Sequence, residues 1–310
     1  MAEITAGMVR DLREKTGVGM MDCKAALAAT NGDMDAAVDW LRAKGLAKAA
    51  KKSTRVAAEG LVGVAVKGTT GAAVEVNSET DFVARNEKFQ AMVGEITKLA
   101  LDAGGNGEKL KTTKFPGSHH AVAEYVAEMV ATVGENMAVR RTAALSVKDG
   151  VIGSYVHNQI APGMGKIGVL VALESTGDKN ELAQFGRMLA MHVAATNPVA
   201  MDISGVPAAT LAREKAILEE KNAGKPANVL EKIMASGLKT YAKENCLLEQ
   251  AWVHDGTKNV TQSIAEAASK AGAPLKLLGY VRMQLGEGIE KKDDDFAADV
   301  AKAARQGASQ

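Results

Sequence analysis

One arrangement occurs twice in this chain: a strand, a turn, a second strand and then a helix. In the first copy, alternating apolar residues predict strands over 60–66 and 71–77, and a helical pattern follows. In the second copy, strands over 151–157 and 167–173 precede a helix over about 180–195. An antiparallel sheet with one apolar face needs a covering layer. The repeat therefore predicts an α+β fold with two similar subdomains, each an antiparallel sheet covered by helices.

Composition limits the function classes. The chain has 310 residues, 46% of them hydrophobic and 24% charged, which suits more than one domain. A net charge of +1 argues against broad attraction to nucleic acid or membrane, so neither is predicted as a direct partner. Cys23 and Cys246 lie far apart and indicate two reduced, buried thiols. Without a signal pattern or an apolar run of transmembrane length, we expect a cytoplasmic protein.

The N-terminal part reads as a small helical bundle. Residues 1–45 predict three short helices; Thr5 can cap the first and Asp33 the third, and Gly45 ends the third. Met20 and Met21 are successive helical positions, so at most one faces the core squarely and the other is available for contact. Arg13 lies on the outer side of the first helix. A fully buried Met and a solvated Arg is an equally good interpretation.

Two amphipathic helices interrupt the second copy. A turn over 222–226 separates them, which predicts an antiparallel hairpin within about 198–246. A seam this short stands poorly alone, which favours packing on a second protein or subunit. We therefore divide the chain into a three-helix domain with a basic linker, a first subdomain, a second subdomain with the inserted hairpin, and a C-terminal module: 1–54, 55–140, 141–281 and 282–310.

The corner between strand and helix in the first copy holds a solitary aromatic residue. Phe82 stands beside Asp81 among polar neighbours, in a chain with only 4% aromatic residues. An aromatic residue next to a charge is typical of an interface anchor. A Phe folded back onto the core is an equally good interpretation. Thr80 can cap the following helix or the turn before it.

No catalytic or cofactor motif is present. The chain has no nucleophile elbow, Walker loop, HExxH, CxxC or Rossmann glycine pattern. His119 and His120 are adjacent and do not share a helix face, so they predict no metal site. The acidic run 293–295 lacks the ligand spacing of a calcium loop and suits a helix N-terminus. We therefore predict no enzyme, no cofactor and no metal.

A family resemblance decides between the two interpretations of Phe82, in favour of the interface anchor over the residue folded onto the core. The run Thr80-Asp81-Phe82-Val83 resembles the signature of bacterial elongation factor Ts, a family of nucleotide exchange factors for the GTPase elongation factor Tu. Further matching segments follow in the family's order, and the first helices resemble a ubiquitin-associated domain. These segments are Gly134-Glu135-Asn136 with Arg140-Arg141, Gly153-Ser154-Tyr155 with His157, 286–291 and 295–298.

The resemblance implies a role for each candidate residue. Phe82 would wedge near the Mg²⁺ region of elongation factor Tu, while Asp81 orders the corner. Val133 and Gly134 would lie close to Phe82 and touch the same partner domain.

Other surfaces would engage elsewhere on elongation factor Tu. Arg13, Met20 and Met21 would grip a second face of the nucleotide domain with the C-terminal module. His157 would contact the far domain, although its turn is longer than the family's. The hairpin would be a coiled coil, used for dimerisation in some members and for partner contacts.

Two other functions stay open. The chain is alternatively a non-catalytic binding module that recognises a ubiquitin-like or helical partner through its three-helix domain. An RNA-binding translation protein is disfavoured by the near-neutral charge.

Overall fold

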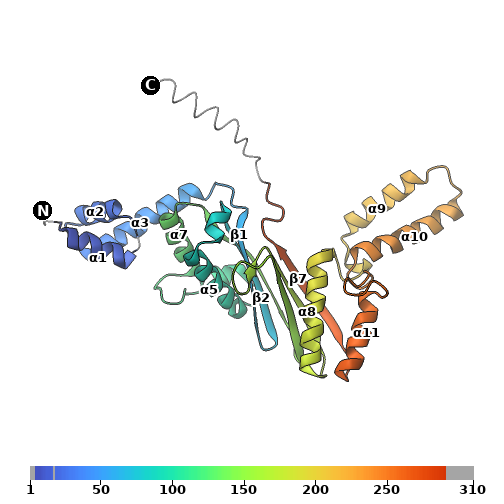
Figure 1. The fold of residues 1–310 in the computed structure, drawn as a ribbon. Helices are drawn as coiled ribbons and strands as arrows, with labels where there is room; N and C mark the ends of the chain where they lie inside the picture. The colour runs from blue at the N-terminus through green and yellow to red at the C-terminus, as the bar shows by residue number, and fades with distance from the viewer. Residues whose placement is uncertain (1–3, 17, 291–310) are drawn as a thin grey trace.

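The protein combines helices with two antiparallel sheets, so the predicted α+β fold class is confirmed. The computed structural model describes residues 4–16 and 18–290. A helical bundle lies at one end, the two sheets lie in the middle, and a helical hairpin projects at the other end (Figure 1). The predicted last helix, which begins at Asp293–Asp295, lies outside the described residues. No helix in the described ranges is both long and apolar enough to span a bilayer.

The bundle consists of α1 (Ala6–Thr16), α2 (Met20–Ala29) and α3 (Met34–Lys52). The Thr5 hydroxyl accepts a hydrogen bond from the Met8 backbone N–H at 3.2 Å, and Asp33 accepts one from Ala36 at 2.9 Å, so both predicted caps are confirmed. The prediction that the third helix ends at Gly45 is wrong. α3 continues to Lys52, so the third helix and the basic linker are one element.

Gly45 serves packing rather than helix termination. A Cβ at this position would lie only 3.2 Å from the Cβ of Ala131 in α7 (Val122–Val133). The glycine therefore lets two helices approach closely, and tertiary packing overrides its low helix propensity.

The first sheet has the order β3-β2-β1-β5. Its strands are β1 (Glu59–Lys67), β2 (Thr70–Ser78), β3 (Met137–Ser146) and β5 (Met164–Gly165). Helix α5 (Glu87–Ala103) and α7 cover one face, with the apolar side of α5 fully inside the core. A short α4 (Asp81–Ala84) precedes α5, and α6 (Gly107–Thr112) follows it. The glycine-rich stretch 98–118 suggests irregular structure, but α5 and α6 occupy much of it.

The second sheet has the order β4-β6-β7. Its strands are β4 (Gly150–His157), β6 (Ile167–Glu174) and β7 (Lys276–Gln284), with α8 (Lys179–Thr196) and α11 (Val260–Ala271) packed on it. The two sheets face each other through a shared apolar layer that includes Val62, Ile152 and Leu170. A Cβ at Gly71 would lie 2.6 Å from Ile152, so this glycine permits the close approach of the sheets.

The long turn after His157 joins the two halves. Its last residues form β5, which pairs with β1 at Val62 and Gly63. The Val64 N–H also donates to the Gly163 carbonyl at 2.8 Å, and Met164 packs in the core of the first subdomain. The loop of one copy therefore supplies the last strand of the other copy's sheet.

The hairpin consists of α9 (Ala208–Lys221) and α10 (Ala227–Asn245), after a short 3₁₀ turn at Ile203–Gly205. A Cβ at Gly237 would lie 2.5 Å from Leu218, so the two helices cross closely there. The residues after the hairpin, 248–253, have the composition of a return strand but do not form one. That segment forms turns instead, because Trp252 is buried against Phe185 and its N–H donates to the Lys258 carbonyl at 2.8 Å.

Candidate functional site

Phe82 is held out from the protein on the one-turn helix α4. Its side chain is 79% exposed, while the next two residues, Val83 and Ala84, are buried beneath it. The interpretation that Phe82 folds back onto the core is therefore wrong. Asp81 is half-buried and lies 3.5 Å from Arg85, one turn along the helix.

Residues of the loop after α7 hold the Phe82 corner in place through hydrogen bonds. The Thr80 N–H and hydroxyl donate to the Glu135 carboxylate at 3.0 Å and 2.9 Å. In return, the Asn136 N–H donates to Glu79 at 2.5 Å. Hydrogen bonds to ionised groups are stronger than neutral ones. The two segments therefore hold each other, although 55 residues separate Thr80 from Glu135.

Thr80 does not cap a helix with its side chain, contrary to one prediction. Its hydroxyl is used on Glu135, and no side-chain cap hydrogen bond forms at the start of α4. Asn86 caps α5 instead, by accepting hydrogen bonds from the N–H groups of Lys88 at 2.9 Å and Phe89 at 3.4 Å.

The structure brings Val133 and Gly134 next to this corner. Gly134 ends α7 with φ +90°, a conformation that favours glycine, and Glu135 follows it directly. Lys52 at the end of α3 donates to the Gly134 carbonyl. Both residues are half-buried, so part of this loop is open to solvent beside Phe82.

Met20 and Met21 are both exposed, at 50% and 79%. The alternative of a fully buried Met is therefore wrong, because Cys23, Ala26 and Leu27 fill the bundle side of α2. Arg13 is exposed on α1. These three side chains take no part in the hydrogen bonds that fix the Phe82 corner.

His157 is exposed at the end of β4, in the other sheet. Its Nδ1 atom lies 3.1 Å from the Tyr155 hydroxyl. Its carbonyl accepts a hydrogen bond from the Lys166 N–H at 3.1 Å, which closes the turn that contains β5. The structure therefore does not place His157 in the same cluster as Phe82.

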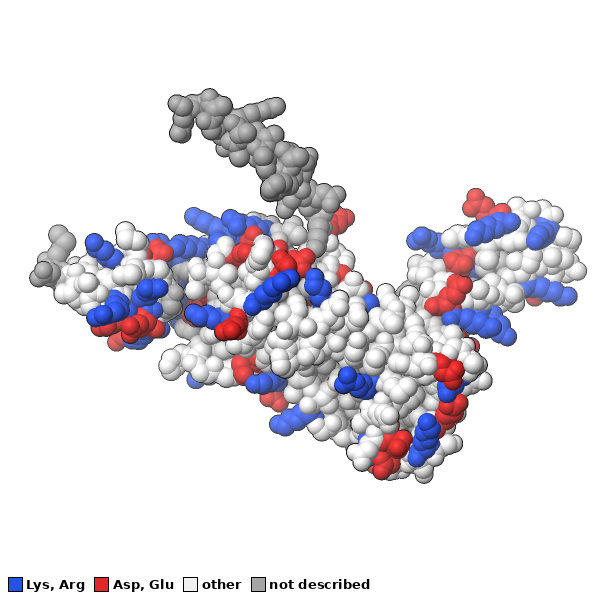
Figure 2. Space-filling model, in the orientation of Figure 1, with Lys and Arg blue, Asp and Glu red and all other residues white. Residues whose placement is uncertain are grey.

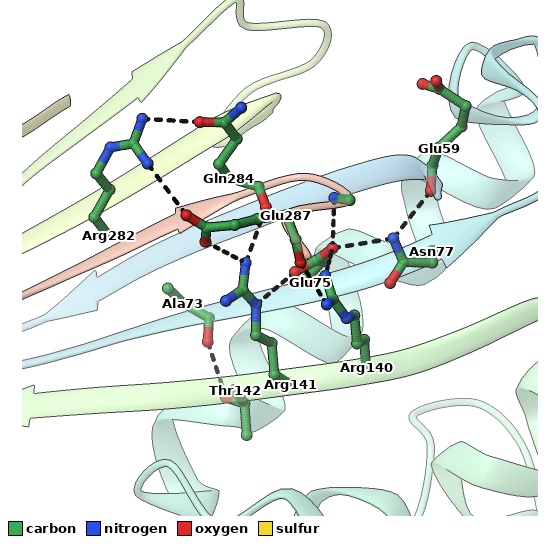
Figure 3. Close-up of polar contacts among 11 residues, drawn as sticks. Glu59, Ala73, Glu75, Asn77, Arg140, Arg141, Thr142, Arg282, Gln284 and Glu287 are labelled. Atoms are coloured by element: carbon green, nitrogen blue, oxygen red, sulfur yellow. Dashed lines mark hydrogen bonds and ion pairs between the residues drawn. The ribbon is translucent and has the colours of Figure 1, made fainter. Parts of the chain in front are cut away.

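A buried carboxylate joins the first sheet to the segment after β7 (Figure 3). Glu75 of β2 has no solvent exposure. It accepts hydrogen bonds from Arg140 at 2.9 Å, Arg141 at 2.6 Å, the Gly286 N–H at 2.8 Å and the Asn77 amide at 3.0 Å. The guanidinium of Arg141 also pairs with Glu287 at 3.1 Å.

Burial by itself raises the pKa of Glu75, but the hydrogen bonds from Gly286, Asn77 and the two arginines outweigh it. The pKa therefore lies below its ordinary value of 4.5, and the carboxylate is ionised.

Both arginines meet one acid although they are neighbours on a strand. Regular alternation would point Arg140 and Arg141 to opposite faces of the sheet, with one of them paired and the other solvated. The register of β2 with β3 shifts between Glu75 and Val76, so Arg140 is an extra residue in a β-bulge. The bulge turns both side chains toward Glu75, as bulges commonly re-aim side chains.

An ion pair attaches the bundle to the core: Arg42 of α3 lies 2.8 Å from Glu124 of α7. Within the core, the His120 ring lies 3.0 Å from Glu128 of α7. His119 and His120 precede α7, which begins at Val122, and the His120 ring reaches Glu124 and Glu128 on that helix.

These features define a class of protein: a helix-and-sheet protein that presents an exposed aromatic side chain on a firmly held corner. Acidic and basic side chains are interspersed over the face in Figure 2. An exposed aromatic ring on a rigid support is suited to enter a pocket of another protein.

Comparison with known proteins identifies the family. The model of the family described as elongation factor TS matches residues 79–287. Elongation factor Ts of Xanthobacter autotrophicus is 61% identical over 306 residues, 99% of this chain and 100% of that protein. The Methylobacterium nodulans protein of the same name is 62% identical over 98% of this chain and 100% of its own length. The chain belongs to the elongation factor Ts family.

Proposed function

We propose that this protein is a guanine-nucleotide exchange factor for elongation factor Tu. Family membership supports the activity. The observation that carries the proposal is Phe82, which is 79% exposed on a corner fastened by Glu135 and Asn136.

Exchange follows from thermodynamic linkage. A GTPase holds GDP through contacts to its phosphates and Mg²⁺. A factor that binds the nucleotide-free form more tightly must weaken GDP by the same factor, because coupling between two ligands is reciprocal. The chain itself hydrolyses nothing in this scheme.

Phe82 would supply the differential contact. We propose that its ring enters elongation factor Tu near the Mg²⁺ site and shifts the backbone that holds Mg²⁺ and phosphate. A wedge of this kind needs a support that does not yield. The hydrogen bonds of Thr80 to Glu135 provide such a support, while Asp81 sets the geometry of α4.

The remaining candidate residues would extend the interface. Val133 and Gly134 would touch the same partner domain as Phe82. Met20, Met21 and Arg13 would contact a second face of that domain, and His157 a more distant one. We further propose that the hairpin is a contact for the partner or a second copy, and that the chain divides into 1–54, 55–140, 141–281 and 282–310.

The test is release of labelled GDP from elongation factor Tu by the wild type and by Phe82→Ala. Loss of an interface anchor costs about 2 kcal/mol, or roughly 30-fold in the acceleration of release. Val66→Ala is the matched control, because Val66 is an exposed apolar residue on the turn side of β1. Undiminished release by Phe82→Ala would remove Phe82 from the mechanism, and no acceleration by the wild type would remove the function.

A second candidate function rests on the exposure of both Met20 and Met21. A binding module for a ubiquitin-like or helical partner would use these side chains without any effect on GDP. If Met20→Ser/Met21→Ser slows GDP release, the two methionines belong to the exchange interface. If release is unchanged while binding of such a partner is lost, the binding module is favoured.

A further inference from the structure

Helix α3 belongs to both the bundle and the first subdomain. It contributes Ala37 and Leu41 to the core of the bundle, while Ala49 near its other end packs against the core of the first subdomain. Between these points, Arg42 pairs with Glu124 of α7 at 2.8 Å. The helix has 19 residues and therefore spans about 28 Å. One continuous helix thus joins the bundle to the first subdomain (Figure 1).

Lys52, the last residue of α3, lies at the C-terminal end of α7. Its ammonium group donates a hydrogen bond to the carbonyl of Gly134, the residue that ends α7. The last carbonyl groups of a helix have no partner within the helix and carry partial negative charge, so a cation is favoured beside them. Lys52 is half-buried, which leaves this contact less screened by salt than a contact between exposed groups. The contact therefore ties the end of α3 to the end of α7.

The loop after α7 contacts the segment after α3 on one side and the Phe82 corner on the other. Asn136 is buried, and its side-chain amide donates to the Arg55 carbonyl at 2.8 Å. Its backbone N–H donates to Glu79 at 2.5 Å, and the Arg55 guanidinium lies 3.5 Å from the same carboxylate. These contacts form a cluster, which we call the junction, made of residues 52–55, 79–80 and 134–136.

The charges within the junction balance each other. Lys52 and Arg55 supply the positive charges, and Glu79 and Glu135 supply the negative ones. Each carboxylate accepts a hydrogen bond from a different segment: Glu79 from the loop after α7, and Glu135 from Thr80 at 2.9 Å. Hydrogen bonds to ionised groups are stronger than neutral ones. A displacement of α3 is therefore passed on to the Phe82 corner through the loop.

We propose that Lys52 and Asn136 are positioning residues for Phe82. They fix its corner to the end of α3, so that the ring and the exposed methionines of the bundle reach elongation factor Tu on one rigid body. This inference rests on the proposed exchange function. Only contacts that differ between the GDP-bound and the nucleotide-free partner weaken GDP, and a ring on a loose corner yields instead of shifting the partner. The junction therefore sets the maximal acceleration of GDP release more than the affinity for the GDP-bound partner.

GDP release measured over a range of factor concentrations tests this role. Lys52→Met keeps the apolar stem and removes the donor. Its maximal acceleration is expected to fall about fivefold, while the concentration for half-maximal acceleration changes by less than about twofold. Lys52→Arg restores a donor and should recover most of the loss. Lys51→Met, at the exposed neighbouring position, is the control and should match the wild type.

A merely structural role of Lys52 gives a different result. If Lys52→Met only reduced the folded fraction, half-maximal acceleration would need more protein and the maximum would stay unchanged, which would overturn the proposal. Asn136→Ala removes the donor to the Arg55 carbonyl and should lower the maximum in the same way. In the Phe82→Ala background, Lys52→Met should cause no further loss, because the ring through which it acts is absent. An equal loss in both backgrounds would also overturn the proposal.

Hydrogen exchange on the full chain tests the junction without elongation factor Tu. The N–H groups of Thr80 and Asn136 donate to carboxylates across the junction, so Lys52→Met should speed their exchange several-fold. Unchanged exchange at both groups overturns the proposal whatever the GDP measurement shows. A wild type that fails to accelerate GDP release overturns the proposed function, whereas faster exchange in Lys52→Met would still show that the junction holds the corner.

Discussion

The two strand-to-helix corners occupy equivalent places in the two copies, but one is exposed and the other is covered by a helix. The corner between β2 and α5 carries Phe82 into solvent, at 79% exposure. The corner between β6 and α8 is packed under α11, where a Cβ at Gly177 would lie 2.6 Å from the Ala271 carbonyl oxygen. Ser175 in this second corner is buried, and the segment contains no aromatic residue. A covering helix thus decides whether the corner is a surface or part of the interior.

The difference extends to the forces that hold each corner. Backbone contacts hold the covered one: the Asp178 N–H donates to Ala271 at 2.9 Å, and the Ser175 N–H to Asp149 at 3.1 Å. Within residues 4–16 and 18–290, no helix lies over the open corner, so it depends on the carboxylate of Glu135 and on the charges around Glu75 in the strand before it. The open corner is therefore held by carboxylate hydrogen bonds to a distant segment, whereas the covered corner is held by backbone hydrogen bonds and by the packing of α11.

The largest expected effect is a loss of stability when the buried charge of Glu75 is removed from the first copy. Glu75→Gln is expected to cost about 3 kcal/mol in the free energy of unfolding at pH 7, because it leaves Arg140 and Arg141 beside a neutral group in a buried network. Urea unfolding measures the loss. Glu108→Gln, at a side chain with 84% exposure, is the control and is expected to cost under about 0.5 kcal/mol.

The effect of Glu75→Gln on stability should also depend on pH in a defined direction. The pKa of Glu75 is lowered in the folded protein, so its contribution is present above the ordinary value of 4.5 and is lost as the pH falls through the folded pKa. The stability difference between the wild type and Glu75→Gln should therefore shrink in acid. A difference that stays constant down to acid unfolding would contradict an ionised Glu75.

An intermediate effect is expected at the covered corner. Gly177→Ala places a Cβ against the backbone of Ala271 and should cost about 2 kcal/mol by overpacking. Gly256→Ala is the matched control, since a Cβ there meets nothing within 4 Å. Thermal unfolding of both variants measures the difference. Equal stability of the two variants would show that α11 shifts at little cost to accommodate the added Cβ, so that the corner is less tightly covered than its geometry indicates.

The smallest expected effect concerns the support of the open corner. Glu135→Ala removes the acceptor for Thr80 and should reduce GDP-release activity by about 1 kcal/mol, or roughly fivefold, while Phe82 itself remains. Lys88→Ala, an exposed change at the start of α5, is the control. Full activity of Glu135→Ala would mean that Phe82 works without a rigid support.

Local patterns in the sequence predicted most of the fold. The spacing of apolar residues marked β1, β2, β4, β6, α5 and α8, since amphipathic periodicity is set by the element itself. Predictions failed where distant residues decide the outcome. Gly45 reads as a helix end until α7 is placed beside it, and one of Arg140 and Arg141 reads as solvated until the bulge in β3 turns both to Glu75.

The candidate site was predictable in part. Phe82 was found from its polar surroundings and from the family resemblance, but its exposure depends on the absence of a covering helix, which no local pattern reports. Glu75 and Glu135 gave no signal, because all their partners but Asn77 lie 55 to 211 residues away in sequence. Met20 and Met21 are both exposed because Cys23 and Leu27 already fill the bundle side of α2.

The strand β5 has a consequence for the order of assembly during synthesis. β1 emerges from the ribosome roughly a hundred residues before Gly165, its partner on that side. Until then, the outer edge of β1 is an unpaired strand that can join a neighbouring nascent chain. The first sheet is therefore complete only after β5 has been synthesised. A pause in translation before that point leaves the outer edge of β1 free to pair with another chain.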